Sequence, residues 1–196
     1  LINKVEKLNH VKQVEKAFDI APSDFTVSLG ITKEPFSEIQ TWTNVNTDSS
    51  LLAGEKPSEG EVAVPDTFAK KWDKTNWKKI IGETLHLEYK MLNKDGAPVA
   101  ISQDAKVSGI TKGSPAQNPL TMNFKTLQKS FVANHIVSEP NFIVPTIDDS
   151  HNVKSVVNKI QNLKTDGKKD FVTFSLGAVL KPINNITSIV TIVLAL

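Results

Sequence analysis

The sequence contains no cysteine and no arginine. Without cysteine the chain cannot form a disulfide, a thiolate zinc site or a cysteine nucleophile. All 23 basic residues are lysines, so the planar guanidinium that grips phosphate, carboxylate or guanine with two hydrogen bonds is missing. The net charge is only +2, which gives no strong field toward a polyanion. The composition therefore argues against nucleic-acid binding and other phosphate-centred functions.

The sequence also lacks recognisable catalytic motifs. It has no glycine-rich phosphate loop, no dinucleotide-binding glycine pattern, no nucleophile elbow and no S-x-x-K motif. Asp148, Asp149 and His151 could supply metal ligands, but Asp and Ser at a corner between a strand and a helix more often cap the helix. His86 falls on the polar side of an alternating segment and is expected to face solvent. We therefore expect no catalytic residue, no cofactor and no metal, and a protein that is not an enzyme.

The remaining composition is that of an ordinary soluble domain. The chain has 196 residues, of which 39% are hydrophobic and 22% charged, enough to form one domain or two small lobes. Its lysine-only, asparagine-rich composition resembles that of proteins from AT-rich Gram-positive bacteria. Residues 1–4 show no signal peptide, so we expect any export element to precede them.

Hydrophobic periodicity predicts a mixture of helices and strands. Apolar residues at steps of three or four predict a helix over 2–18. Strict alternation predicts a strand over Thr84–Met91, and Asn93–Gly96 is typical of a hairpin turn that leads to a returning strand. The β-branched run at 141–147, followed by a helical stripe over 153–163, predicts a strand and then a helix.

The last eleven residues, Ile186–Leu196, form an uncharged apolar run. Eleven residues cannot cross a bilayer, because a spanning helix needs roughly twenty. Two interpretations remain. The run either begins a transmembrane helix at which the fragment was cut, with Lys181 as an interfacial anchor, or forms a buried strand, as its β-branched content favours. We expect the first of these.

Several ordered segments resemble the periplasmic core domain of MacB-like and FtsX-like ABC transporter permeases. The segments are Val11–Glu15, Leu51–Pro57, Glu61–Val64, Phe68–Trp72, Ile81–Leu87 and Ala105–Ile110. The likeness extends over most of the chain, since 141–163 and the approach to the apolar tail are similar to the last third of that domain. One departure is Glu55, which stands where the family often has arginine.

The resemblance implies an α+β fold with two lobes. A porter-like βαβ lobe would comprise 1–48 and 119–180, a β-rich lobe would be inserted at 49–118, and 181–196 would begin the truncated transmembrane helix. It also implies a non-catalytic extracytoplasmic domain at the cell membrane. Its partners would be the permease membrane helices, a separate cytoplasmic ATPase subunit and a possible second permease copy.

Three tryptophans are the candidate ligand or partner surface: Trp42, Trp72 and Trp77. Tryptophans with apolar neighbours are more often part of a core or of a contact between lobes, so both interpretations stay open. The alternative function is a surface-anchored binding or adhesion domain with a single C-terminal membrane anchor. A secreted hydrolase is a third possibility, but it would need an acidic or histidine-centred pocket.

Overall fold

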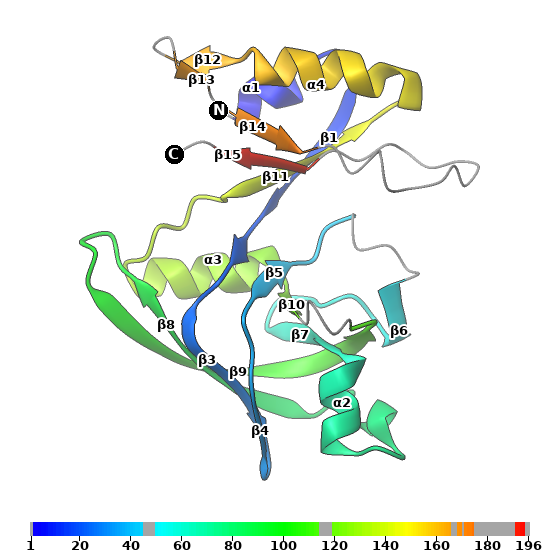
Figure 1. Cartoon of the computed structure of the whole chain (residues 1–196), viewed down its shortest axis with the longest axis vertical. Coiled ribbons are helices and arrows are strands. Elements are labelled where there is room, and N and C mark those ends of the chain that lie inside the picture. Colours follow the sequence, from blue (N-terminus) through cyan, green and yellow to red (C-terminus); the bar gives the residue numbers. More distant parts are fainter. Residues whose placement is uncertain are drawn as a thin grey trace. The chain divides into compact units, whose positions relative to one another are not determined.

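The computed structural model describes residues 2–44, 50–113, 119–165, 168–169, 171–174 and 191–194. The predicted α+β class is confirmed, because mixed sheets and several helices alternate along the chain (Figure 1). The chain divides into two compact units. Unit 1 comprises 1–17, 43–45 and 140–196, and unit 2 comprises 18–42 and 46–139.

Unit 1 is built from both ends of the chain. Its sheet has the order β1-β11-β15-β14. Its elements are α1 (Ile2–Glu6), β1 (Val11–Ala17), β11 (Phe142–Ile147), η3 (Ser150–Asn152), α4 (Val153–Gln161), β12 (Lys164–Thr165), β13 (Lys168–Lys169), β14 (Phe171–Phe174) and β15 (Thr191–Leu194). The predicted strand-then-helix segment is confirmed as β11 followed by α4.

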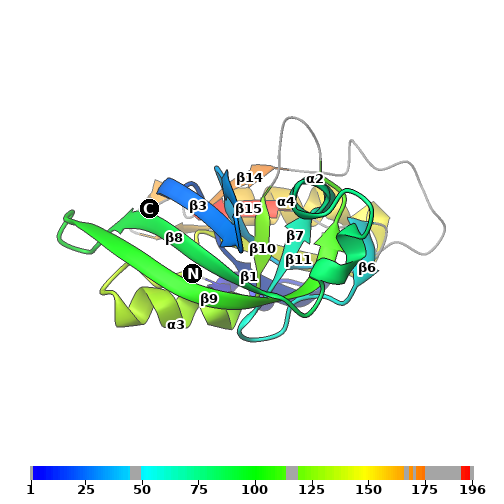
Figure 2. The same cartoon turned by 90° about the horizontal axis from the view of Figure 1, so that it is seen from below.

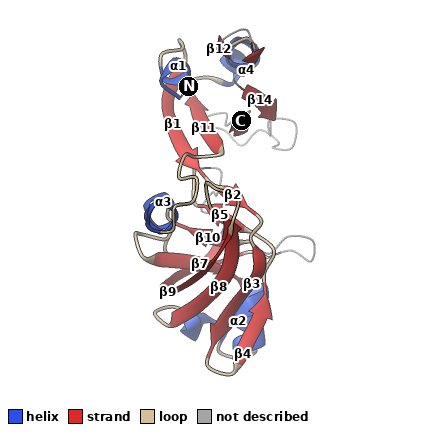
Figure 3. Cartoon of the chain, turned by 90° about the vertical axis from the view of Figure 1, so that its left-hand side faces the viewer, coloured by secondary structure: helices blue, strands red, loops and turns tan. Residues whose placement is uncertain are grey.

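Both helices of unit 1 cover one face of this sheet (Figures 1 and 3). Val5 of α1 and Val156 of α4 are fully buried together with Ile143 of β11. The amphipathic pattern of α4 places Val156 and Ile160 four residues apart on the same side, and both are completely buried. The hydrophobic effect therefore holds the two chain ends in one small core.

The predicted helix over 2–18 is wrong beyond its first turn. The helix ends at Glu6, His10 adopts a positive φ of 77° and the chain continues as strand β1. A β-bulge between Val11 and Gln13 shifts the register of β1 against β11, so Val11 and Val14 both pack on the core of unit 1. The bulge thus produces a three-residue spacing of valines on one face, which imitates a helical stripe.

The apolar tail is described only in part. Thr191–Leu194 form strand β15, which pairs antiparallel with β11 and β14. These four residues form a strand, which is the alternative interpretation of the apolar run given above, and not part of a membrane helix. The rest of 181–196 lies outside the described residues. Within the described part of the chain, no helix has the length and apolar character to cross a membrane.

Unit 2 is centred on a nine-stranded mixed sheet within the described residues. The order is β2-β5-β10-β7-β9-β8-β3-β4, and β6 also pairs with β9. Its elements are β2 (Asp19–Ile20), β3 (Ser23–Leu29), β4 (Thr32–Pro35), β5 (Ile39–Thr41), β6 (Leu51–Gly54), β7 (Glu61–Pro65), α2 (Asp66–Trp72), η2 (Trp77–Ile80), β8 (Thr84–Leu92), β9 (Pro98–Thr111), β10 (Leu120–Met122) and α3 (Phe124–Ala133).

Unit 2 is larger than the inserted lobe expected from the sequence, which spanned 49–118. Residues 18–42 belong to it because β3 pairs with β8 and β5 pairs with β10. Residues 119–139 belong to it because β10 pairs with β7 and α3 contributes Leu127 and Phe131 to the same core. Long-range strand pairing therefore sets the extent of the unit, and no composition change along the chain marks it.

The hairpin of β8 and β9 is the longest feature of unit 2. The amide of Asn93 donates to the carbonyl of Ala97 at 2.8 Å, and Gly96 supplies the positive φ of 78° that the turn needs. Leu85, Leu87 and Tyr89 of β8 are buried, as the alternating pattern predicts. Helix α3 packs on this buried face, with Phe131 against Phe18 at 5.0 Å between ring centroids. The predicted hairpin is confirmed.

Candidate functional site

The structure does not gather the three tryptophans on one element. Trp42 follows β5, where its amide donates to the carbonyl of Met122 at 2.8 Å. Trp72 ends α2 and Trp77 begins η2, and both are half-buried and packed on the unit 2 core. β5 and α2 lie toward opposite ends of the unit (Figures 1 and 3). Only Trp72 and Trp77 therefore lie near each other in the chain, and both pack against the hydrophobic core of unit 2.

Lysines surround Trp77. The ammonium groups of Lys70 and Lys78 lie 5.3 and 5.4 Å from the ring centroid of Trp77, within cation–π range. Lys70 also pairs with Asp66, and Lys71 pairs with Glu34. Part of this basic charge is therefore neutralised by neighbouring carboxylates, which fits the solvated face that such a run usually forms.

The polar corner after β11 is a helix cap, as expected. Asp149 precedes η3, and its carboxylate accepts the amide of His151 at 2.8 Å. His10 reaches this corner from the other chain end, with its Nδ1 3.0 Å from Oδ2 of Asp148. Hydrogen bonds from Asn152 and His10 hold the pKa of Asp148 below its usual value. Among the described residues, no group of three or more acidic or histidine side chains could hold a metal.

His86 lies on the solvent face of the sheet, but it is not isolated. Its Nδ1 is 2.7 Å from Oδ1 of Asp104, and its Nε2 is 3.2 Å from Oγ of Ser102. This is the bonding order of a Ser-His-Asp triad. The side chains of His86 and Asp104 are nevertheless 45% and 68% exposed on an open strand surface. A nucleophile there has no enclosed site to exclude water, so the cluster fits a cross-strand polar ladder.

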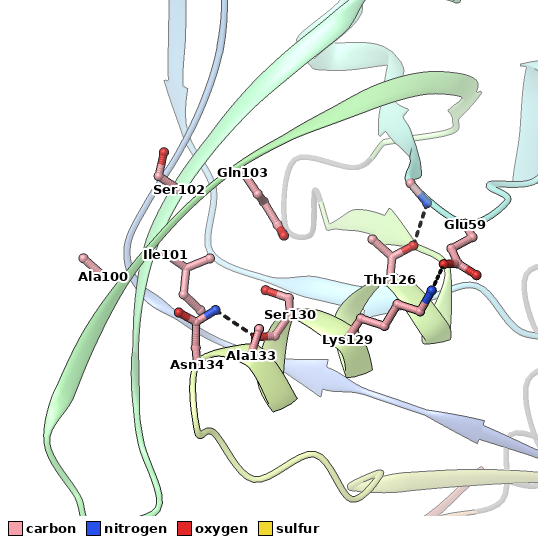
Figure 4. Close-up of a pocket in the computed structure, with 11 residues that line it drawn as sticks. Glu59, Ala100, Ile101, Ser102, Gln103, Thr126, Lys129, Ser130, Ala133 and Asn134 are labelled. Carbon is pink, nitrogen blue, oxygen red and sulfur yellow. Dashed lines mark hydrogen bonds and ion pairs between the residues drawn. The ribbon is translucent and has the colours of Figure 1, made fainter.

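A different feature, an open hollow beside β9, is the best candidate for a binding site. It has a volume of about 720 Å³ and lies wholly within unit 2 (Figure 4). β9 contributes four consecutive residues, 100–103, α3 contributes Thr126, Lys129, Ser130 and Ala133, and Asn134 follows the helix. Glu59 and Gly60 close one end just before β7 begins.

Polar groups form the floor of the hollow. Gln103 points from β9 toward Ser130 of α3 (Figure 4), and its Nε2 donates to the hydroxyl of Tyr89 at 3.1 Å. Burial raises the pKa of the Tyr89 hydroxyl to about 12, although its hydrogen bonds with Ser130 and Gln103 act in the opposite direction. A neutral hydroxyl and amide network therefore links β8, β9 and α3 beneath the hollow.

Hydrogen bonds fix α3 alongside β9 at both ends of the hollow. At one end, the amide of Gly60 donates to Oγ1 of Thr126 at 2.8 Å and Lys129 pairs with Glu59. At the other end, the amide of Lys94 in the hairpin turn donates to the carbonyl of His135 at 3.0 Å. Asn123 caps the helix by accepting the amide of Lys125 at 2.9 Å. The hollow is thus bounded by elements that are firmly held.

The sequence analysis did not predict any residue of this hollow. Apart from Ile101, its uncharged lining residues are small, hydroxyl or amide residues, which occur on any protein surface, and only Glu59 and Lys129 are charged. The one local signal is Gly60, at the end of a Pro-Ser-Glu-Gly stretch that precedes a predicted strand. That pattern indicates a turn and carries no information on what lies across from it.

No protein-family model matches the chain, and no curated protein matches it significantly. A firmly walled and open hollow beside a strand, with polar and apolar lining residues, can bind an extended or small molecule, whereas the clusters around His86 and Asp148 lie on exposed surfaces.

Proposed function

We propose that this chain is the non-catalytic extracytoplasmic domain of an ABC transporter permease, which binds a substrate or partner and couples that binding to the membrane helices. The observation that carries this proposal is the construction of unit 1 from both chain ends, with unit 2 inserted between them. The same arrangement, a lobe of both ends with a β-rich insertion, is what the resemblance to the MacB-like and FtsX-like domains implies.

The order of elements in unit 1 also supports the proposal. β11 precedes α4 in the chain, and β14 follows α4 after the short strands β12 and β13; β11 and β14 both belong to the sheet that contains β1. Membrane helices attached at the two ends would therefore pull on one compact unit, and a ligand on the inserted unit would be sensed through it. ATP hydrolysis would belong to a separate cytoplasmic subunit, and a second permease copy could complete the transporter.

The pairing of Thr191–Leu194 as β15 affects the detail of this proposal. Because β15 places four residues of the apolar run from Ile186 in the sheet of unit 1, the support for a permease domain is the two-unit architecture and not this run as the start of a membrane helix. Localisation at the extracytoplasmic face of the cell membrane, in a Gram-positive cell, remains part of the proposal.

The test uses the parent protein in its own cells, with an affinity tag at its cytoplasmic end. We expect membrane helices on both sides of this chain in the full reading frame, copurification of an ATPase subunit after mild solubilisation, and labelling of Lys74, Lys78 and Lys79 by a membrane-impermeant amine reagent on intact cells. These lysines are exposed, and a cytoplasmic lysine-rich tag is the unlabelled control.

Two outcomes would overturn the proposal. Labelling of these lysines only after cell lysis would place the chain inside the cell. A cleavable signal peptide before the chain, with a single membrane helix after it and no associated ATPase, would favour the surface-anchored binding or adhesion domain instead.

A further inference from the structure

Among the described residues, one edge of β9 has backbone groups with no strand partner. β8 and β9 pair antiparallel from Thr84↔Lys106 to Leu92↔Pro98. The flanking pairs with direct hydrogen bonds are Asn93 with Ala97 and Glu83 with Val107. Since hydrogen-bonded pairs alternate along an antiparallel ladder, the odd-numbered residues of β9 bond to β8, and the amides and carbonyls of residues 100, 102 and 104 point to the other edge.

We call the strand position next to β9, on the side away from β8, the lane beside β9. A described strand occupies this lane only from Lys106 onward. β7 pairs with β9 in parallel, but its register begins at Glu61↔Lys106. The amide of Lys106 turns outward as expected for an even-numbered residue and donates to the carbonyl of Gly60 at 3.2 Å. Before that point the chain leaves the lane through a turn in which the amide of Glu61 donates to the carbonyl of Ser58 at 3.0 Å and Gly60 has a φ of 83°. In the part of the chain that the structure describes, no strand occupies the lane beside residues 100–104.

The hollow lies along this same edge. Four consecutive residues of β9 line it, Ala100 to Gln103. Side chains of consecutive strand residues point to opposite faces, so a single hollow can touch all four only along their shared backbone edge. Figure 2 shows α3 running beside β9, and Figure 4 shows Gln103 pointing toward the helix while Ser102 points away.

The groups exposed in the lane match a peptide backbone. Outward amides and carbonyls repeat at every second residue, which is the spacing that another strand satisfies along its whole length. Residues 100–104 would pair with roughly four or five residues of an extended chain, at about 3.3 Å per residue. Apart from the Glu59–Lys129 ion pair, which neutralises itself, the lining is uncharged and combines hydroxyl and amide side chains with Ala100, Ile101 and Ala133. The lining therefore fits uncharged side chains.

We propose that the edge of β9 at residues 100–104 is a docking site for an extended, uncharged peptide segment of a partner protein, which adds a strand between β9 and α3. This inference rests on the binding role proposed above and names the chemistry of the ligand. Its backbone pairs with Ala100, Ser102 and Asp104, and its side chains on the helix side meet Gln103, Ser130 and Thr126.

The test selects ligands for the 196-residue chain from a displayed library of random heptapeptides. The enriched peptide is then synthesised with a fluorescent label and measured by fluorescence anisotropy. Ser102→Pro removes one outward amide without touching the ladder to β8, and we expect it to weaken binding about tenfold or more. Ser102→Ala is the matched comparison: it keeps that amide and should bind at least about tenfold more tightly than Ser102→Pro.

A second pair of variants tests the hollow itself without altering the edge. Ala133→Tyr places a ring in the hollow and should also weaken binding about tenfold or more by excluding the peptide. Val132→Tyr adds the same ring at the adjacent exposed position of α3, outside the hollow, and should leave binding unchanged. Two methylated peptides complete the test, one with N-methyl groups on its odd-numbered amides and one with them on its even-numbered amides. Only one of the two should lose binding, because only every second amide of the peptide faces β9.

Three results would overturn the inference: no peptide is enriched above a control selection without protein, selected peptides bind Ser102→Pro and Ala133→Tyr as tightly as the wild type, or both methylated peptides keep binding. Concentration-dependent dimerisation that Ser102→Pro abolishes would also overturn it, because a second copy of the chain would then occupy the edge. Peptide binding without an associated ATPase would contradict the permease proposal alone, and an associated ATPase without peptide binding would contradict this inference alone.

Discussion

The amide of Lys106 donates to the carbonyl of Gly60 at 3.2 Å, and among the described residues this bond marks the point where a strand begins to pair with the outer edge of β9. On one side of it β7 pairs with β9; on the other side the amides of the even-numbered residues 104, 102 and 100 point away from β8, along the edge that borders the hollow. The position of one turn, at Gly60, therefore decides how much of the β9 edge is open to a ligand.

Amide exchange should show this alternation directly. In the unliganded chain we expect the amides of Ala100, Ser102 and Asp104 to exchange at least about tenfold faster than those of Ile101 and Gln103, because only the latter pair with β8. Hydrogen–deuterium exchange followed by NMR resolves each residue. Equal protection of both sets would mean that the edge is already covered.

Tyr89 should ionise late. It is the only tyrosine in the chain, so absorbance at the tyrosinate band reports this residue alone. Burial raises its pKa to about 12 from the ordinary value of 10.0, and the folded state therefore holds its proton more tightly than the unfolded state. Folding stability should fall as the pH rises above about 10. Titration of the folded and urea-unfolded chain measures both values, and identical midpoints would contradict the burial.

Asp19 should make the protein less stable as the pH rises through neutrality. Burial, followed by a hydrogen bond and charge repulsion from Glu38, raises its pKa from 3.8 to about 7. Between these values the folded state binds more protons than the unfolded state, so this contribution to stability is present in acid and is lost as the pH approaches and passes 7.

Replacing Asp19 removes that loss. Asp19→Asn should raise the free energy of unfolding at pH 8 by about 1–2 kcal/mol, a figure reduced for partial solvent exposure, and should change it little at pH 4. Urea titration at both pH values measures the effect. The control is Asp95→Asn on the exposed hairpin turn, and an Asp19 variant that is destabilised equally at both pH values would rule out this account.

Gly109 should not tolerate a side chain. It pairs with Gly54 across β6 and β9, and a Cβ at residue 109 would lie 2.4 Å from the carbonyl oxygen of Glu55. Because the obstacle is backbone, Gly109→Ala should cost about 2–4 kcal/mol. Gly96→Ala, where a Cβ meets nothing within 4 Å, should cost only about 1 kcal/mol for its positive φ. Thermal unfolding of both variants compares them, and equal costs would contradict the close approach.

Ser102 should not behave as an activated nucleophile, despite its 3.2 Å contact with His86. On an exposed strand surface the pair has no enclosed site to bind and orient a substrate, so a fluorophosphonate probe should leave Ser102 unmodified. Mass spectrometry of the treated chain checks this. Stoichiometric labelling of Ser102 that His86→Ala removes would contradict the non-catalytic proposal.

The local elements with one dominant pattern could be predicted from the sequence. The alternation of Leu85, Leu87 and Tyr89 with polar residues fixed the face that β8 buries, and the Asn-Lys-Asp-Gly turn marked the hairpin. The apolar spacing of 153–160 likewise predicted α4, and the acidic corner before it predicted a cap. These signals work because side-chain period and turn chemistry act over a few residues, which is the range that a single sequence displays.

The failure at β1 has a specific physical cause. The bulge between Val11 and Gln13 moves two valines onto one face at a spacing of three, and only the pairing with β11, about 130 residues away in the chain, makes that bulge favourable. A similar limit applies to Ile186–Leu196, where β-branched residues suit both a strand and the start of a membrane helix.

By itself, the sequence determined the α+β class, the β8–β9 hairpin, the β11–α4 segment and the absence of cysteine and arginine chemistry. Only the tertiary structure decided the extent of the two units, the separation of Trp42 from Trp72 and Trp77, and the open edge of β9 beside α3. The reason is that a strand edge stays unpaired only when no distant segment of the chain lies beside it, which the sequence of that strand does not show. Here the turn at Gly60 diverts the chain before β7, and no pattern within β9 records that event.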